Sequence, residues 1–254
     1  MKLVTLIENT STCGLAWEHG LSLYLETGAH KILFDAGQSG AFADNAQKLG
    51  IDLSQVDLAI LSHGHYDHGG GLLRFLDLNQ KATVYVNHHA FEPHYNARGN
   101  YIGLDPKLQK SGRLIFTDGT YPLGDGLTLF TLDLPPEDTS GLTVLEDGAH
   151  KPEDFRHEQY LMVEEAGKKI LLSGCSHKGI LQITAHFCPD LLIGGFHFMK
   201  ITERASLKQA ADTLLSYPTQ YYTGHCTGQE QFSILKTHMG DRLQQISAGS
   251  VLEL

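Results

Sequence analysis

Short apolar runs along the first two thirds of the chain predict β-strands, and two pairs of these strands read as hairpins. Residues 21–26 and 31–35 flank the turn Thr27-Gly28-Ala29-His30, and residues 159–164 and 169–172 flank Ala166-Gly167. Single strands are expected at residues 3–7, 58–61, 82–86, 114–116 and 127–132. Helices are expected at residues 41–49, which Gly50 would close, and at residues 69–78.

The last third alternates strand and helix patterns. Strands are expected at residues 190–193, 220–223 and 246–252, and a helix at residues 229–238. An amphipathic helix capped by Thr202 and ended by Pro218 is indicated by the spacing of Leu207, Ala210, Ala211, Leu214 and Leu215. Hairpins with interspersed helices indicate two packed sheets with helices outside. No linker-like segment divides the sequence, so we expect residues 1–254 to form one domain.

Two long segments, residues 94–112 and 135–156, are polar, contain glycine and proline, and lack periodicity. Long loops in a compact domain usually carry function. We therefore expect both segments to form walls of the active site.

Composition places the chain among ordinary globular proteins, with 41% hydrophobic and 19% charged residues. A net charge of −10 argues against a nonspecific nucleic-acid binder, which presents a basic face. The four cysteines are scattered without a CxxC pair, and no apolar run reaches 18 residues. The first apolar run reads as a strand, too short for a signal peptide and without its cleavage site, so we do not expect one here. We expect a cytoplasmic protein with free thiols, a small-molecule substrate, and neither nucleic-acid nor membrane partners; a homo-oligomer stays open.

The most distinctive segment is residues 61–71, Leu-Ser-His-Gly-His-Tyr-Asp-His-Gly-Gly-Gly, which follows an apolar strand. Imidazole and carboxylate are ligands that zinc, iron and manganese accept. A closed structural zinc site would use mostly cysteines, and this turn has none. His63, His65, Asp67 and His68 therefore indicate an open, reactive metal site, with Asp67 also placed to orient a water and accept its proton.

The turn matches the HxHxDH signature of the metallo-β-lactamase superfamily, and Phe34-Asp35-Ala36-Gly37 resembles that superfamily's first motif. The resemblance covers nearly the whole chain. It implies an α+β fold, the four-layer αββα sandwich, with the metals at one edge of the two sheets. It also implies that Asp35 supports the metal turn from behind.

The resemblance suggests further ligands one position at a time. His225 in Thr223-Gly224-His225-Cys226 matches the late histidine of the superfamily. Cys175 stands where the bridging aspartate is usual, His157 lies near the slot of a third histidine, and His177 offers an alternative imidazole. Which of Cys175, His177 and His157 completes the site stays open at this point.

Several segments together resemble a bacterial and archaeal branch of hydrolases related to the dihydropterin ribofuranosyl-aminobenzene phosphate synthase of methanopterin synthesis. They include Ser173-Gly174-Cys175-Ser176-His177 and Gly194-Gly195-Phe196-His197. In this setting His197 is a candidate catalytic residue, and His19 and Lys178 are candidates for contacting substrate. The remaining histidines are expected at the surface, including His88, His89 and His94 on one solvated helix face, and His30, His150, His186 and His238.

The chemistry indicated is hydrolysis, because a divalent metal lowers the pKa of water enough to attack a phosphorus or carbonyl centre. We expect one or two Zn²⁺ ions, with Mn²⁺ or Fe²⁺ as alternatives, and a phosphoester as one candidate substrate. Two other functions stay open: a pterin-related synthase that forms a C–N bond, and a metal-containing protein that senses a metabolite without catalysis.

Overall fold

The computed structural model describes residues 1–11, 13–137 and 139–254, which form two large mixed β-sheets and one small sheet. The first large sheet contains, in spatial order, β17 (Val251–Glu253), β1 (Lys2–Ile7), β2 (Ser22–Glu26), β3 (Lys31–Phe34), β4 (Leu58–Ile60), β5 (Thr83–Asn87) and β7 (Leu114–Thr117). The second contains β16 (Leu243–Gln245), β15 (Gln220–Thr223), β14 (Leu191–Ile193), β13 (Lys168–Leu172), β12 (Gln159–Glu165), β9 (Leu127–Thr131) and β8 (Thr120–Gly124). The small sheet joins β11 (Ala149–Pro152), β10 (Thr143–Glu146) and β6 (His94–Tyr95).

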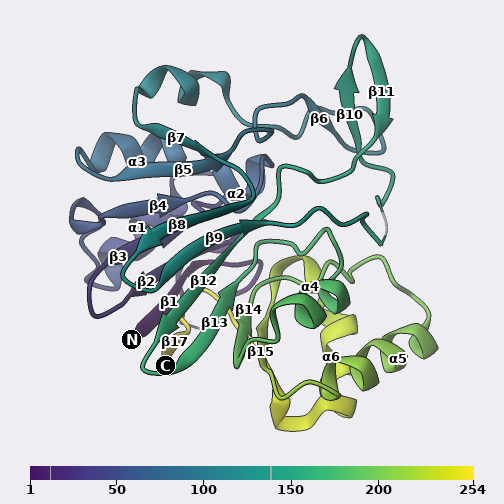
Figure 1. Ribbon diagram of the computed structural model, residues 1–254. Coiled ribbons are helices and arrows are strands. Elements are labelled where there is room, and N and C mark those ends of the chain that lie inside the picture. The colour runs from purple at the N-terminus through teal and green to yellow at the C-terminus, as the bar shows by residue number, and fades with distance from the viewer. Residues whose placement is uncertain (12, 138) are drawn as a thin grey trace.

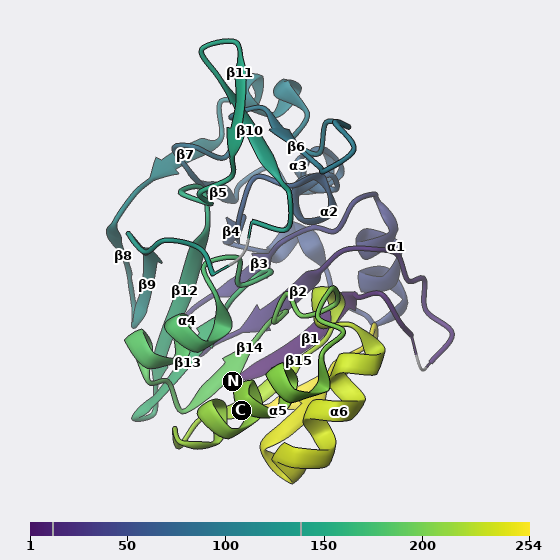
Figure 2. The ribbon, with the colours of Figure 1, turned by 90° about the vertical axis from the view of Figure 1, so that its right-hand side faces the viewer.

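Helices cover the outer face of each large sheet. α1 (Ala41–Lys48) and α3 (Leu72–Leu78) pack on the first sheet, and the short α2 (Tyr66–Gly69) precedes α3. α4 (Ile180–Phe187), α5 (Arg204–Leu215) and α6 (Gln229–Met239) cover the second sheet and lie in front of it in Figure 2. Short 3-10 helices occur at η1 (Leu53–Gln55), η2 (Pro106–Ser111), η3 (His225–Thr227) and η4 (Gly240–Arg242).

Three apolar cores separate the layers, as the alternating patterns require. Leu23, Phe34, Leu161 and Ile170 belong to the core between the two sheets. The other two cores join each sheet to its own helices. This order of helices, sheet, sheet and helices confirms the expected αββα sandwich (Figure 1).

The predicted strands and helices agree with the observed elements over most of the chain, and the differences have identifiable causes. The helix expected at residues 69–78 is broken at Gly70 and Gly71, because both pack against the backbone of residues 36–39. The strand expected at 246–252 is interrupted by a turn in which the Ser250 N–H donates to the Ser247 carbonyl. The chain therefore crosses from β16 in the second sheet to β17 in the first.

Other differences concern the segments that lacked periodicity. Residues 94–112 and 135–156 are not structureless, since they supply β6, η2, β10 and β11; residue 138 lies outside the described residues. The β10–β11 hairpin projects from one end of the molecule (Figure 2). β8 and α4 were not predicted, and the cap expected at Thr202 is absent from α5, which Glu203 precedes without a side-chain cap.

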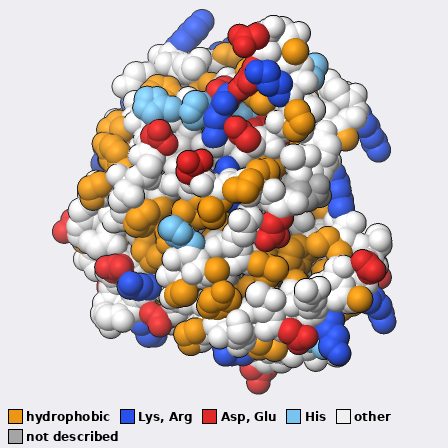
Figure 3. All heavy atoms as spheres, turned by 45° about the vertical axis from the view of Figure 1, so that its right-hand side comes forward, with side chains coloured by type: hydrophobic (Ala, Val, Ile, Leu, Met, Phe, Trp, Pro, Cys, Tyr) orange, Lys and Arg blue, Asp and Glu red, His pale blue; other side chains and the backbone are white. Residues whose placement is uncertain are grey.

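In the described part of the chain, no helix has both the length and the apolar content needed to cross a bilayer. Acidic and basic side chains are interspersed on the face in Figure 3, with apolar side chains between them.

Candidate metal centre

The carboxyl ends of parallel strands deliver the candidate residues to one place. β3 and β4 run parallel in the first sheet, and Asp35 and His63 follow them. In the second sheet β13, β14 and β15 run parallel, and Cys175, His197 and His225 follow their ends. A cavity of about 200 Å³ is lined by Cys175, His197 and His225, and also by His19, His65, Asp67 and His177.

Asp35 fixes the tautomers of two histidines. Its Oδ2 accepts a hydrogen bond from Nδ1 of His68 at 2.6 Å and one from Oγ of Ser62 at 2.7 Å. The Ser62 hydroxyl has one hydrogen, so at 2.8 Å it accepts from Nδ1–H of His63. Both rings therefore direct an Nε2 lone pair away from Asp35, as imidazoles must do to bind a metal. This is the supporting position expected for Asp35.

His225 is oriented in the same way by residues after β1. Its Nδ1 lies 2.9 Å from Oδ1 of Asn9, which can only accept, and its backbone N–H donates to Glu8. The Nε2 atom of His225 then lies 3.2 Å from Nε2 of His68 and 3.4 Å from Oδ2 of Asp67. Electron pairs converge here, and a cation between them would remove their repulsion.

His177 also lines the cavity, and neither nitrogen of its buried ring has a hydrogen-bond partner. Its ring stacks on Phe155 at 4.2 Å, and its backbone N–H donates to Glu158 at 2.7 Å. His63 also has a buried Nε2 without a partner. Buried polar atoms are normally paired, so these orphaned nitrogens indicate a missing ligand.

Cys175 belongs to two clusters of metal-ligating side chains. One contains His63, Cys175 and His177, and the other contains His68, Cys175 and His225; the potential ligand atoms within each lie within 4.8 Å of one another. Thiolate and imidazole donors fit a divalent ion of the zinc or iron type. The residues present therefore fit the metal that the sequence predicted.

Burial and neighbouring charges hold four of the histidines and Asp67 in the forms that bind metals, whereas burial raises the pKa of the Cys175 thiol, so a metal would have to displace its proton. Burial lowers the pKa of His63 and His177 well below the usual range, lowers that of His65 to about 3, and with smaller opposing effects lowers that of His225 to about 4. Burial alone would raise the pKa of Asp67, but His68 and His225 outweigh it and lower that pKa. Neutral imidazoles and an ionised carboxylate are ligand forms.

Burial also disfavours the charged form of His68, yet the charges of Asp35 and Asp67 outweigh it and raise its pKa. This ring therefore holds a proton more firmly than its neighbours do. Metal binding at Nε2 of His68 would displace that proton.

Two expected site residues lie elsewhere. Nδ1 of His157 accepts the backbone N–H of Gly64 at 2.8 Å, so its neutral ring carries the proton on Nε2 and has no lone pair for a metal. The ammonium of Lys178 donates to the carbonyls of Leu134 and Asp154 at 2.6 and 2.7 Å, and Lys178 does not line the cavity. Lys178 therefore ties two loops together, and it lines a different depression, so its predicted contact with substrate stays a prediction.

The prediction that His94 lies on a solvated helix face is wrong. Residues 88–93 form turns, and His94 lies in β6 with its side chain fully buried, 2.7 Å from Glu153. His88 is exposed as expected, and His89 is half-buried. The expectation failed because three nearby histidines are typical of a polar helix face, and the sequence does not show that Glu153, 59 positions away, pairs with His94 in the interior.

The candidate centre contains unusual backbone. Asp35, Ser176, His197 and His225 all have a left-handed conformation, with φ of 59°, 58°, 57° and 48°. Such residues cost about 1–3 kcal/mol each and tend to cluster at functional sites. Gly174 has a different role, because a Cβ there would lie 2.2 Å from Oγ of Ser62.

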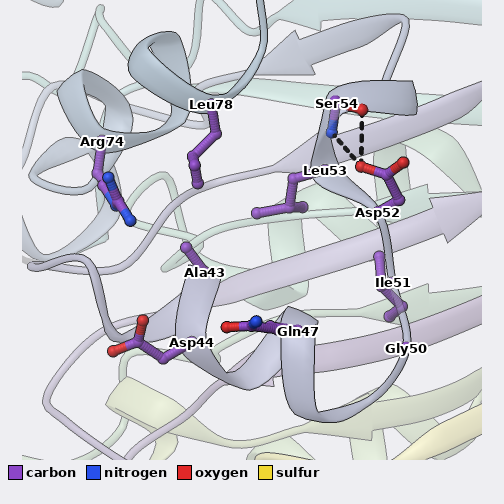
Figure 4. A pocket seen from close by; sticks show the side chains of 10 residues that line it. All are labelled: Ala43, Asp44, Gln47, Gly50, Ile51, Asp52, Leu53, Ser54, Arg74 and Leu78. Atoms are coloured by element: carbon purple, nitrogen blue, oxygen red, sulfur yellow. Dashed lines mark hydrogen bonds between the residues drawn. The ribbon is translucent and has the colours of Figure 1, made fainter.

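A larger depression of about 590 Å³ lies elsewhere, between α1, η1 and α3 (Figure 4). Asp52, Arg74 and Leu78 line it, and its described lining contains neither histidine nor cysteine. Another depression, of about 650 Å³, is larger still and is lined by His89, Arg156 and Lys178, so size alone does not locate the site. The clustered metal-ligating side chains lie in the smaller cavity beside Cys175.

Sequence reasoning missed the supporting residues Glu8, Asn9, Ser62, Glu153 and Glu158. Ser62 had a signal, since it precedes His63 directly. The others had none, because their partners lie 19 to 217 positions away along the chain.

Comparisons with known proteins agree with this geometry. A solved structure described as a metal-dependent hydrolase of the β-lactamase superfamily superposes with a TM-score of 0.86 at 26% identity, covering 100% of this chain and 99% of that one. Zn²⁺-bound PqqB from Methylobacterium extorquens shares the fold alone, with a TM-score of 0.62, 14% identity and full coverage of both chains.

Two proteins of Methanocaldococcus jannaschii are similar in sequence. One, uncharacterised, is 27% identical over 88% of this chain and 89% of its own length. The other, named 7,8-dihydropterin-6-methyl-4-(beta-D-ribofuranosyl)-aminobenzene-5'-phosphate synthase, is 25% identical over 100% of this chain and 96% of its own length. The profile of the metallo-beta-lactamase superfamily matches residues 15–222, and the chain belongs to this superfamily.

Proposed function

We propose that the protein is a metal-dependent hydrolase of a small molecule. One observation carries this proposal: several histidines, each held at one ring nitrogen by a supporting residue, direct the other nitrogen toward Cys175 beside an open cavity. Each of His63, His68 and His225 has Nδ1 bonded to a supporting side chain and Nε2 turned inward. A structural site would be closed, whereas this one borders a cavity.

In this proposal two ions share Cys175. His63, His177 and His65 would hold the first, and Asp67, His68 and His225 the second. Nε2 of His65 is buried without a partner although His65 lines the cavity, so a ligand atom facing the cavity can only be Nδ1. The soft thiolate favours zinc or iron over manganese. Bound divalent ions lower the pKa of water to about 7 and stabilise negative charge on the attacked group.

The protein's own groups would complete the reaction. The low pKa of Asp67 keeps its carboxylate ionised, so it can orient a water and accept hydrogen bonds from it. His19 lies 3.3 Å from Asp67 and is half exposed, and His197 lies on the opposite part of the cavity wall beside His177. Both histidines are placed to contact a substrate. We take phosphoesters as the first substrate class, because two metals clamp their oxygens well.

A second candidate function is supported by one comparison. The relative named as a pterin-related synthase aligns with the whole chain, so the same centre could assist C–N bond formation with loss of diphosphate. The solved relative of 26% identity is described as a hydrolase, which favours the first candidate.

The test combines metal analysis with a substrate screen. We expect two ions per chain and turnover of at least one phosphomonoester, phosphodiester or lactone. His63→Ala and Asp67→Asn should abolish turnover, whereas His186→Ala, at an exposed histidine, should not. Metal-loaded protein that turns over none of these compounds, but joins a pterin diphosphate to an aminobenzene compound, would establish the synthase instead. Protein that binds no metal would overturn the proposal.

A further inference from the structure

Behind the metal centre lies a second cluster of buried histidines, formed by His65, His94 and His157. Ring nitrogens of the three side chains lie within 4.8 Å of one another, and Nε2 of each ring is buried without a hydrogen-bond partner. The rings of His94 and His157 stack at 4.0 Å, and the ring of His65 meets that of His94 nearly edge-on, with centroids 5.6 Å apart.

The hydrogen bonds around this cluster argue against a third metal. His157 accepts the Gly64 N–H at Nδ1, so its neutral ring has a proton on Nε2. That Nε2 lies 3.7 Å from Oε1 of Glu153. The Nε2–H of His157 therefore lies near the carboxylate without forming a hydrogen bond to it, and only two lone pairs of the cluster remain for an ion.

Glu153 determines the tautomer of His94. This carboxylate is 1% exposed, and its Oε2 lies 2.7 Å from Nδ1 of His94. An ionised carboxylate only accepts, so Nδ1 of His94 carries the proton and Nε2 keeps a lone pair. The nearest ring outside the stacked pair is His65, whose own Nε2 lacks a partner.

We propose that His94, held by Glu153, is a positioning residue for the metal ligand His65. With the metal bound, a small shift of the rings would let Nε2–H of His65 donate to Nε2 of His94, which would place the remaining lone pair of His65 on Nδ1, toward the cavity; without the metal neither Nε2 has a partner. The chain of hydrogen bonds would then run from Glu153 through His94 to His65 and would give Nε2 of both His94 and His65 a partner. The inference rests on the proposed function, since it takes His65 as a ligand.

The mutational test compares His94→Phe with His94→Gln. Phenylalanine keeps the bulk of the ring but accepts no hydrogen bond, whereas the glutamine carboxamide oxygen can accept one from His65. We expect His94→Phe to weaken zinc binding about 10–100-fold in competition with a chelator, the usual size of such indirect effects. His94→Gln should recover much of this loss, and His88→Phe, at an exposed position of the same segment, should cause none.

Two spectroscopic readouts separate positioning from simple packing. The visible absorption of the Co²⁺-loaded protein should change in His94→Phe and return toward wild type in His94→Gln. Long-range ¹H–¹⁵N spectra of the zinc-loaded wild type should show the proton of His65 on Nε2 and that of His94 on Nδ1. This second measurement needs no variant, so it decides the inference even if His94→Phe fails to fold.

The opposite tautomer on either ring would overturn the inference, as would a His94→Phe protein that matches His88→Phe in zinc affinity. A third ion per chain that is lost in both His94→Phe and His157→Phe would replace it with a metal site. Wild-type protein that binds no metal would instead refute the proposed function.

Discussion

Sγ of Cys175 lies 3.2 Å from Nε2 of His68, where the superfamily motif would place a carboxylate oxygen. A thiolate at this point gives the centre a soft donor that both proposed ions can share. We expect Cys175→Ala to lower zinc affinity at least tenfold, and Cys175→Asp to retain zinc while raising the affinity for Mn²⁺ relative to zinc. Metal titration of the three proteins measures both effects.

Co²⁺ loading gives an independent reading of the same residue. Thiolate-to-metal absorption in the near ultraviolet should be present in the wild type and in Cys188→Ala, whose thiol is exposed. The band should be absent from Cys175→Ala and Cys175→Asp. Persistence of the band in Cys175→Ala would show that Cys175 is not a ligand.

Asp35→Asn should weaken the binding of the second ion and also lower the stability of the fold. A carboxamide can present its NH₂ group to His68 and reverse the tautomer, so we expect metal affinity to fall about 10–100-fold. The free energy of unfolding of the metal-free protein should fall by about 1–3 kcal/mol, because Ser62 and His68 lose a buried acceptor.

The matched control is Asp57→Asn. Asp57 forms an exposed ion pair with Lys81 at 3.1 Å, and such pairs contribute at most about 1 kcal/mol. Urea unfolding and calorimetric metal titration supply the two measurements. Equal losses in both variants would mean that Asp35 has no special connection to the metal.

Removal of the metal should lower the melting temperature. At a free concentration one hundred times Kd, one bound ion stabilises the folded state by about 2.7 kcal/mol. For a chain of this size that corresponds to a shift of about 5–10 °C. Thermal unfolding with and without a chelator measures it. An unchanged midpoint in protein shown to be metal-free would contradict a centre formed by the fold.

Gly174→Ala should disturb the centre through Ser62. The added Cβ would lie 2.2 Å from Oγ of Ser62 and 3.0 Å from Nδ1 of His63, so one of these side chains must move. We expect a loss of about 1–3 kcal/mol in stability and at least tenfold weaker binding of the first ion. Gly28→Ala is the control, because the nearest contact of its Cβ is a flexible glutamate oxygen at 3.5 Å; comparable losses there would remove the support for this explanation.

The secondary structure that could be predicted was that which depends on the local spacing of apolar residues. The apolar runs of β2 and β3 and the helical spacing in α5 depend on neighbours a few residues away, so they could be predicted from the sequence. β8 was missed because Pro122 and two glycines obscure its alternation. The strand expected at 246–252 failed because residues 246–250 carry the chain from β16 in the second sheet to β17 in the first, a change of sheet that periodicity cannot predict.

For the candidate centre, the compact HxHxDH turn was visible because its residues are adjacent in sequence. The choice between His157 and His177 was not, since it depends on which ring has a nitrogen already bonded. One backbone contact from Gly64 to His157 and one carboxylate from Glu158 beneath His177 make that difference. Neither contact leaves any trace in residue spacing.

The left-handed backbone at Asp35, Ser176, His197 and His225 has a consequence for engineering. Glycine at any of the four positions would relieve torsional strain, but at Asp35 it would also remove the buried acceptor of Ser62 and His68, so the hydrogen bonds there offset the strained backbone. Each such substitution would replace a side chain that lines or braces the cavity. Thermostabilised variants of this chain should therefore be sought among surface loops, with these four positions held constant.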